Sequence, residues 1–201
     1  MNRLLSIATI AAVFLLFAGC MGTFETARVV PFKVGATYFT TVDSNEDDSY
    51  GMPGIIVETG WPAGPSRFGI GLHLRVAAFI GTDGTDDDGV LVIWGGKLQL
   101  PQNSIADIAL GVDLWGYYPG EIKLFLSRRI GVIEPYACVG IAAFLDANTD
   151  IDILATDGLV SYTLGTMIEF GSGSGWILAA EIEGGDVWAS PGVGVGLIKE
   201  F

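Results

Sequence analysis

The feature that most constrains the fold is a period of two. Ten short runs between Lys33 and Phe201 carry apolar residues at every second position. Successive side chains of a β-strand point to opposite faces, so each run predicts a strand with one apolar face. In the run at 68–77, one parity consists of Phe68, Ile70, Leu72, Leu74 and Val76, and the other of Gly69, Gly71, His73, Arg75 and Ala77. One face is uniformly apolar, whereas the other mixes glycine with charged residues.

These runs predict an all-β chain with ten strands. We expect strands at 33–42, 52–62, 67–80, 89–100, 105–115, 120–131, 134–146, 158–170, 175–184 and 191–201. Short turns rich in Gly, Pro, Ser and Asn, at 63–66, 101–104 and 171–174, and at 132–133, alternate with longer segments such as 43–51, 81–88 and 147–158. This alternation predicts an up-and-down antiparallel transmembrane β-barrel, with an eight-strand barrel as the alternative if one pair is misassigned.

The aromatic residues favour a membrane barrel over a soluble β-sandwich. A soluble sandwich turns a polar face to water, whereas here the uniform face is the apolar one. Aromatic rings also collect at strand ends, where the boundary of a bilayer would lie. Those at the short-turn end are Trp61, Phe68, Phe170, Trp176 and Phe201, and those at the other end are Trp115, Tyr117, Tyr118 and Trp188.

The inward parity combines many glycines with a few large side chains. Glycine leaves space inside a narrow barrel. We expect Phe39, Phe125 and Phe144 to occupy that space. Cys138 also has inward parity, and we expect it to act as a small buried apolar residue.

The first 19 residues resemble a lipoprotein signal peptide. Arg3 precedes an apolar stretch at 4–16 that is too short to span a bilayer. Residues 17–20 read Phe-Ala-Gly-Cys, which is similar to the bacterial lipobox except that Phe17 replaces the usual leucine. The resemblance implies a signal peptide at 1–19, lipidation of Cys20, a tether at 20–32 and a barrel at 33–201. Ordinary cleavage beside an incidental cysteine is the alternative.

The last strand resembles the assembly signal of bacterial outer-membrane barrels. It alternates apolar residues from Val193 and ends in Phe201, with Lys199 at a position that is usually apolar or aromatic. The resemblance implies a small outer-membrane β-barrel protein that the barrel-assembly machinery recognises through Phe201. We expect a monomer that is both lipid-anchored and integrated in the bacterial outer membrane, with membrane lipids and lipopolysaccharide as its partners. A net charge of −13 argues against binding to nucleic acid.

The longer connections are acidic, and one resembles a calcium loop. By this assignment they hold thirteen acidic residues and no Lys or Arg, namely Asp43, Glu46, Asp47, Asp48, Asp83, Asp86, Asp87, Asp88, Asp146, Asp150, Asp152, Asp157 and Asp186. Oxygen ligands recur at alternate positions in one of them, at Asp146, Asn148, Asp150 and Asp152, with Asp157 at the twelfth position. Ile151 replaces the glycine that makes the turn in such loops. Plain solvation of acidic loops is the alternative, and we expect no other cofactor.

The inward parity carries charges of both signs, which predicts a network of ion pairs in the lumen. Opposite charges in so narrow a space pair with one another. The expected members are Glu58, His73, Arg75, Lys97, Asp107, Asp113, Lys123, Arg129, Glu169, Glu181 and Glu183, joined by Lys33, Glu121 and Glu200 at the same parity. Such a network favours a plugged lumen, and a wetted cation-preferring passage is the alternative.

Three functions follow from this interpretation. The first is a non-enzymatic barrel with a structural or surface-interaction role through acidic external loops. The second is a narrow cation-preferring diffusion channel. The third is a lipid- or peptide-modifying barrel enzyme, for which His73, the only histidine, has no Asp two positions away and no Ser at the spacing used by lipid A deacylases. We therefore expect no catalytic residue.

Overall fold

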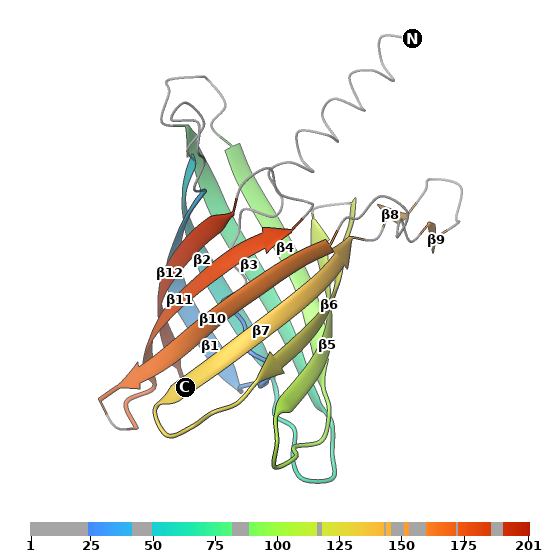
Figure 1. Ribbon diagram of the computed structural model, residues 1–201, viewed down its shortest axis with the longest axis vertical. Coiled ribbons are helices and arrows are strands. Elements are labelled where there is room, and N and C mark those ends of the chain that lie inside the picture. Colours follow the sequence, from blue (N-terminus) through green and yellow to red (C-terminus); the bar gives the residue numbers. More distant parts are fainter. Residues whose placement is uncertain are drawn as a thin grey trace.

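The structure is a computed structural model that describes residues 24–41, 50–81, 89–115, 118–142, 144–145, 151–152, 160–171, 173–185 and 191–201. Within these ranges, ten strands form one closed antiparallel barrel, and β1 closes the ring by pairing with β12 (Figure 1). The barrel strands are β1 Phe32–Thr41, β2 Tyr50–Trp61, β3 Gly69–Gly81, β4 Gly89–Gln99, β5 Asp107–Trp115, β6 Tyr118–Ser127, β7 Ile133–Ala142, β10 Val160–Phe170, β11 Trp176–Gly185 and β12 Gly192–Glu200. The up-and-down fold is confirmed, with ten strands rather than eight.

Two strand ends differ from the sequence prediction. The run expected at 134–146 leaves the barrel at Ala142, because Phe144–Leu145 (β8) pairs with Ile151–Asp152 (β9) in a separate two-stranded sheet beside the barrel (Figure 1). Phe144 therefore does not belong to the barrel wall, and the strand expected at 134–146 is four residues too long. At the other end, β6 stops at Ser127 because Gly131 has a φ of 63°, which makes a tight turn before β7.

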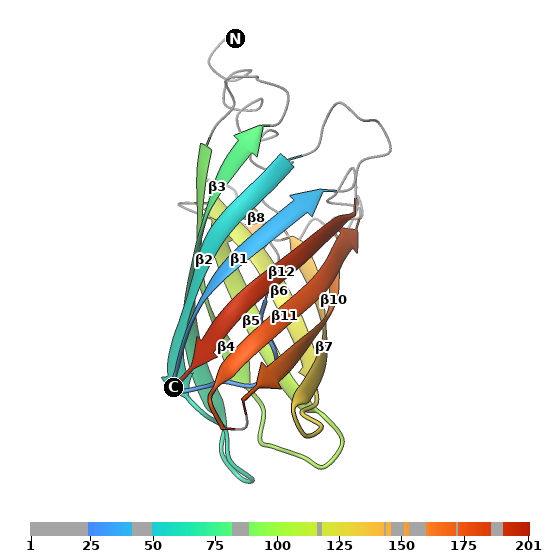
Figure 2. The same cartoon turned by 90° about the vertical axis from the view of Figure 1, so that its left-hand side faces the viewer.

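The two ends of the barrel differ in their connections. The short-turn end carries the connections at 62–68, 100–106, 128–132 and 171–175, and the C-terminus lies there as well (Figure 2). At this end the amide of Phe201 donates to the carbonyl of Phe32, so the last residue is attached to the first strand. The opposite end carries the connections at 42–49, 82–88, 116–117 and 186–191 and the one between β7 and β10.

The outer surface of the barrel is apolar around its circumference. Leu72, Leu164 and Leu178, on three different strands, each expose half or more of their surface. The expected aromatic residues of the short-turn end also face outward, with Trp61 74% and Phe201 67% exposed. Those expected at the opposite end lie outside the residues whose side chains are described. No helix long and apolar enough to cross a membrane occurs in the described residues.

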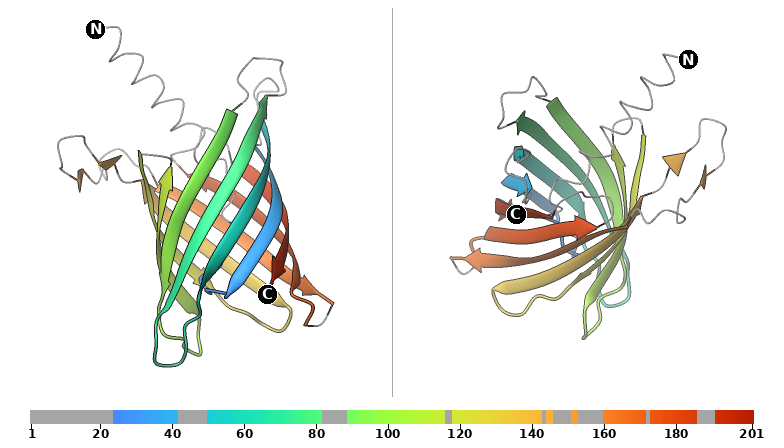
Figure 3. Two further views of the ribbon diagram at one scale, coloured as in Figure 1. Left: turned by 180° about the vertical axis from the view of Figure 1, so that it is seen from behind. Right: turned by 45° about the horizontal axis from the view of Figure 1, so that its top comes forward.

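The inner surface is polar and densely filled, and the strands wind around it with a steep tilt (Figure 3). Large inward rings lie over inward glycines, as expected. Phe39 lies against Gly192 and Gly194, and Phe125 lies against Gly111. Cys138 is buried and carries no disulfide. The inward glycines therefore leave space for these rings, because a β-carbon at the glycine positions would collide with them.

Candidate functional site: the filled lumen

The most informative feature of the lumen is a piece of the chain that precedes the first strand. Residues 24–31, which we call the lumen segment, lie inside the barrel rather than outside it. Glu25 and Ala27 have no exposed surface, and Phe24 is 2% exposed. Of the tether expected at 20–32, residues 24–30 are enclosed by the strands, whereas Pro31 is exposed at the short-turn end and Phe32 begins β1. Lipidation of Cys20 stays a prediction, because residues 1–23 lie outside the described ranges.

The segment enters the lumen at the short-turn end. The carbonyl of Pro31 accepts hydrogen bonds there from the amide of Gly60 at 3.2 Å and from the hydroxyl of Thr59 at 3.0 Å. These two bonds join the base of the segment to the C-terminal end of β2. The point of entry is therefore fixed by one main-chain and one side-chain donor to the Pro31 carbonyl.

Lumen side chains satisfy the backbone of the segment. The amide of Phe24 donates to Glu181 at 2.9 Å, and the amide of Val29 donates to Gln99 at 2.8 Å. The ammonium group of Lys97 donates to the carbonyl of Thr26 at 2.9 Å, and Lys33 donates to the carbonyl of Phe24 at 3.3 Å. Buried backbone groups are costly without partners. These partners come from β1, β4 and β11, so the segment is held from several sides.

The charged side chains of the segment pair with the wall as well. Glu25 lies 2.9 Å from Nδ1 of His73, and neither side chain has exposed surface. Arg28 lies 2.7 Å from Glu134 and 3.3 Å from Glu200. The segment therefore contributes one charge of each sign to the lumen network.

Asp113 is the centre of the largest group of charges. It accepts from His73 at 2.8 Å and from Lys123 at 2.7 Å, and it also pairs with Arg75. His73 thus bridges Asp113 and Glu25 through its two ring nitrogens. Gly95 lies between the strands that carry His73 and Asp113, and a β-carbon there would collide with the histidine ring.

A second group of charges is centred on Glu58, which is fully buried. Lys33 lies 2.7 Å from one of its oxygens, and Lys97 lies 2.8 Å from the other. Because Lys97 also holds Thr26, this group connects the wall to the lumen segment. A buried carboxylate with two cations keeps its charge compensated.

Three further glutamates line the lumen. Glu181 accepts from the hydroxyl of Tyr136 at 2.5 Å in addition to the Phe24 amide. Glu121 accepts from the hydroxyl of Ser161 and lies 3.1 Å from Lys123. Glu183 is 4% exposed, and its Oε2 has no hydrogen-bond partner among the described residues.

The remaining predicted members lie near the short-turn end. Asp107 accepts from the amide nitrogen of Gln99 at 3.3 Å. Arg129 and Glu169 pair with each other at the rim, where Arg129 is exposed, rather than joining the buried groups. The described structure therefore brings together nine of the eleven predicted residues inside the barrel and leaves this pair at its edge.

Several lumen residues escaped the sequence analysis. Gln99 and Glu134 lie on inward faces, and their strand parity was a usable signal. Glu25 and Arg28 belong to no strand, so a period of two says nothing about them.

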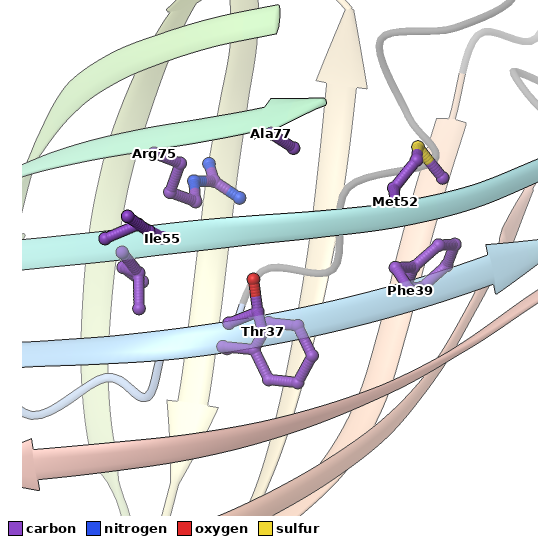
Figure 4. A pocket seen from close by; sticks show the side chains of 8 residues that line it. Thr37, Phe39, Met52, Ile55, Arg75 and Ala77 are labelled. Carbon is purple, nitrogen blue, oxygen red and sulfur yellow. The ribbon is translucent and has the colours of Figure 1, made fainter. Parts of the chain in front are cut away.

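Little free volume surrounds the tip of the segment. The ring of Phe24 packs against Gly194 and Gly196 on β12, where an added β-carbon would press against the ring. A cavity of about 10 Å³ remains beside it, lined among others by Thr37, Phe39 and Arg75 (Figure 4). That volume is close to the minimum that one water molecule requires. The barrel is therefore filled at this level.

The predicted calcium loop lies almost entirely outside the described residues. This applies to Asp146, Asn148, Asp150 and Asp157, and for Asp152 only the backbone pairing with Phe144 is described. Within the described ranges, no group of three or more His, Cys, Asp or Glu side chains has a geometry that could hold a metal ion. Calcium binding stays a prediction.

Comparison with known proteins adds no family. No protein-family profile and no curated protein matches the chain. Among solved structures, the translocator domain of the autotransporter NalP from Neisseria meningitidis is similar at 13% identity and a TM-score of 0.35, over 100% of this chain and 98% of that one. A chain from a structure described as "Asymmetric conductivity of engineered proteins" is similar at 9% identity and a TM-score of 0.34, over 85% of this chain and 99% of that one.

Proposed function

We propose that this protein is an outer-membrane β-barrel with a non-enzymatic structural or surface-interaction role, and that the lumen segment closes its interior. The observation that carries the proposal is the seating of residues 24–31. Their backbone and both of their charged side chains have partners on the barrel wall. A segment bound in this way is an integral part of the folded barrel, and it occupies the route that a solute would take through the lumen.

The outer surface supports the membrane location. Soluble monomers rarely expose a continuous apolar area larger than a few hundred Å². Here apolar side chains face outward on every barrel strand, from Tyr38 on β1 to Leu197 on β12. A closed barrel also satisfies all of its main-chain groups internally, as a bilayer requires. The C-terminal Phe201 is exposed at the short-turn end, where an assembly factor could bind it.

The arrangement of charges supports a closed lumen. Breaking a buried ion pair costs about 3–5 kcal/mol because it leaves an uncompensated charge behind. Displacing the segment would separate Glu25 from His73 and Arg28 from Glu134. A cavity of about 220 Å³ opens beside Arg28 and Phe201 at the short-turn end, but the barrel is filled around Phe24.

The same lumen supports a non-enzymatic role. Both ring nitrogens of His73 face carboxylates, and its side chain has no exposed surface. A general base needs a route to its substrate, and the lumen segment covers this histidine. We therefore assign no residue to catalysis.

A narrow cation-preferring channel is the second candidate. It is favoured by one observation, the grouping of three buried carboxylates, those of Glu121, Glu181 and Glu183, on the inner face of the barrel. Such a surface would attract cations if the segment moved aside.

Planar-bilayer conductance distinguishes the two candidates. The wild-type protein is expected to conduct little. A variant with 24–29 replaced by alternating Gly and Ser, which keeps the length but removes every side-chain contact, is expected to conduct steadily. An Arg129→Ala variant, which alters only the exposed rim pair, serves as the matched control. Steady conductance by the wild type would favour the channel.

The membrane location has its own test. A closed barrel resists SDS until it is heated, so the band of the refolded protein should migrate differently before and after boiling. A soluble β-rich monomer in buffer without detergent would refute the membrane proposal.

A further inference from the structure

The Lys and Arg side chains divide into two groups according to their partners. Nine of the ten belong to residues that the structure describes. Six of these nine form ion pairs with described carboxylates, namely Arg28, Lys33, Arg75, Lys97, Lys123 and Arg129. The other three are Arg67, Arg128 and Lys199, which we call the basic rim, and they form no ion pair with a described carboxylate. Asp107 is near enough to Arg128 to affect it electrostatically, but it is buried and bonds to Gln99 instead.

The basic rim is distributed around the mouth at the short-turn end (Figure 2). Arg67 is exposed in the connection from β2 to β3. Arg128, which follows β6, donates to the carbonyl of Asn103 in the connection from β4 to β5 at 3.1 Å. Lys199 on β12 donates to the carbonyl of Ser174 in the connection from β10 to β11. The three cations thus involve all four short connections, and a carbonyl partner leaves their formal charge uncompensated.

Lys199 lies on the outer surface among aromatic rings. It shares the outward parity of β12 with Val195 and Leu197. Its ammonium nitrogen lies 5.8 Å from the centre of the Trp176 ring and 5.1 Å from that of the Phe201 ring, and both rings are exposed. Aromatic rings of this kind and lysines with an extended stem favour the boundary between the hydrocarbon and the headgroups of a bilayer. In the proposed membrane, the basic rim therefore lies at the depth of the lipid headgroups.

We propose that the basic rim binds the phosphate groups of anionic phospholipids in the leaflet at the short-turn end. This inference rests on the proposed outer-membrane location. Phosphate is the anion that a phospholipid bilayer presents at the depth of its headgroups. Guanidinium and ammonium groups both bind phosphate through charge-assisted hydrogen bonds. Lipid is the source of that phosphate because the rings beside Lys199 are suited to a lipid boundary.

The distribution of negative charge supports the same choice of leaflet. The longer connections, at the opposite end, contain many acidic residues and no Lys or Arg, so their charge repels anionic headgroups. At the short-turn end, Glu169 and Glu200 are partly exposed, but they pair with Arg129 and Arg28. These two carboxylates therefore leave the charge of the basic rim in place. The barrel is asymmetric along its axis, with its cationic end fitted to lipid phosphate.

Lipid selectivity measured by native mass spectrometry tests the inference. The full chain is refolded in vesicles and released into detergent that contains equimolar phosphatidylglycerol and phosphatidylcholine with identical acyl chains. The ratio of the two lipids bound to the barrel is then determined. The wild type should favour phosphatidylglycerol by about fivefold at low salt, the factor that about 1 kcal/mol per cation near anionic lipid gives. The variant Arg67→Gln, Arg128→Gln, Lys199→Gln should bind both lipids equally.

Two control variants separate phosphate binding from a disturbed rim. The variant Arg67→Lys, Arg128→Lys, Lys199→Arg keeps all three charges and should keep the preference. The variant Arg129→Gln, Glu169→Gln removes the ion pair at the same end without a change in net charge, and it should behave as the wild type does. A wild type without preference overturns the inference. So does a preference that survives the three substitutions to Gln, or one that is lost equally in the charge-conserving variant.

Failure of the membrane location gives a different result. A chain that inserts into neither phosphatidylcholine nor phosphatidylglycerol vesicles, and stays a soluble monomer in buffer without detergent, refutes the location and the inference together. A barrel that forms in both kinds of vesicle, with the expected change in SDS migration on boiling, but that binds both lipids equally, refutes the inference alone.

Discussion

The backbone amide of Phe24 donates a hydrogen bond of 2.9 Å to the carboxylate of Glu181, which lies 157 positions further along the chain. The same carboxylate oxygen accepts from the hydroxyl of Tyr136 at 2.5 Å. Two donors from separate parts of the chain thus meet one buried acceptor. This junction ties the segment that precedes the barrel to β7 and β11, neither of which pairs with β1.

Replacing Asp113 by Asn should destabilise the barrel strongly. The substitution keeps the shape of the side chain but removes the charge that compensates Arg75 and Lys123, both of which are buried. We expect the free energy of unfolding, measured in urea with the protein in lipid vesicles, to fall by about 3–5 kcal/mol. Glu169→Gln keeps an oxygen that can accept from the amide of Gly175 and weakens the pair with the exposed Arg129, so it should cost less than about 1 kcal/mol. Equal costs for the two variants would contradict the assignment of Asp113 as the centre of the network.

A Gly165→Ala substitution should displace Tyr136. The ring of Tyr136 lies directly over Gly165, and an added methyl group would occupy its place. Overpacking of this kind costs about 1–3 kcal/mol, and here it would also weaken the hydrogen bond to Glu181. Adding Tyr136→Val should make the double variant more stable than the sum of the two single effects predicts. Gly96→Ala, where the new atom meets only the carbonyl of Gly71 and one leucine methyl, should change the melting temperature less.

Replacing Cys20 by Ser should abolish lipid attachment. The sequence resembles a lipobox that ends at Cys20, and the described chain holds its other cysteine, Cys138, buried in the barrel. Metabolic labelling with a radioactive fatty acid should therefore mark the wild-type protein and the Cys138→Ser control, but not Cys20→Ser. Labelling that persists in Cys20→Ser would place the lipid elsewhere.

Calcium should stabilise the acidic connection that resembles a calcium loop. The carboxylates of this connection repel one another, and salt at physiological ionic strength screens that repulsion only beyond a Debye length of about 8 Å. A divalent cation bound between them relieves the repulsion. Weak binding, in the ~0.1–1 mM range of extracellular calcium modules, should raise the melting temperature of the wild type. The variant Asp146→Asn, Asp150→Asn, Asp157→Asn should lose that rise. No rise in the wild type at millimolar calcium would mean that the connection is only a solvated acidic surface.

The wall of the barrel could be predicted because one physical rule acts on each of its strands. A strand that separates two environments must alternate between residues suited to each. Phe68 and Ile70 therefore reveal the outer face, and His73 and Arg75 the inner face, without any knowledge of the neighbouring strands. The large inward rings followed from the same rule, because Phe39 and Phe125 needed space that only inward glycines leave. Phe144 shows the limit of the rule. Alternation continues to it, but pairing with Asp152 takes it out of the barrel.

The contents of the barrel could not be predicted in the same way. The lumen segment has no periodic pattern, and Glu25, Thr26 and Arg28 look like an ordinary polar linker. Their partners become visible only in the closed ring, since His73 on β3 and Glu134 on β7 lie four strands apart. Parity did place Asp113, Arg75 and Lys123 on the inner face, but it could not show that all three meet.

The seating of residues 24–31 constrains the order in which the molecule assembles. Once β1 has paired with β12, the interior around Phe24 has no room through which a peptide could be threaded from outside. The segment must therefore be in position while the seam between these two strands is still open, and the sheet then closes around it. Sealing of the first strand to the last thus becomes the final step of folding. A bulky domain fused ahead of residue 24 would stall the chain at that step, whereas an equally large fusion between strands at the long connections would not.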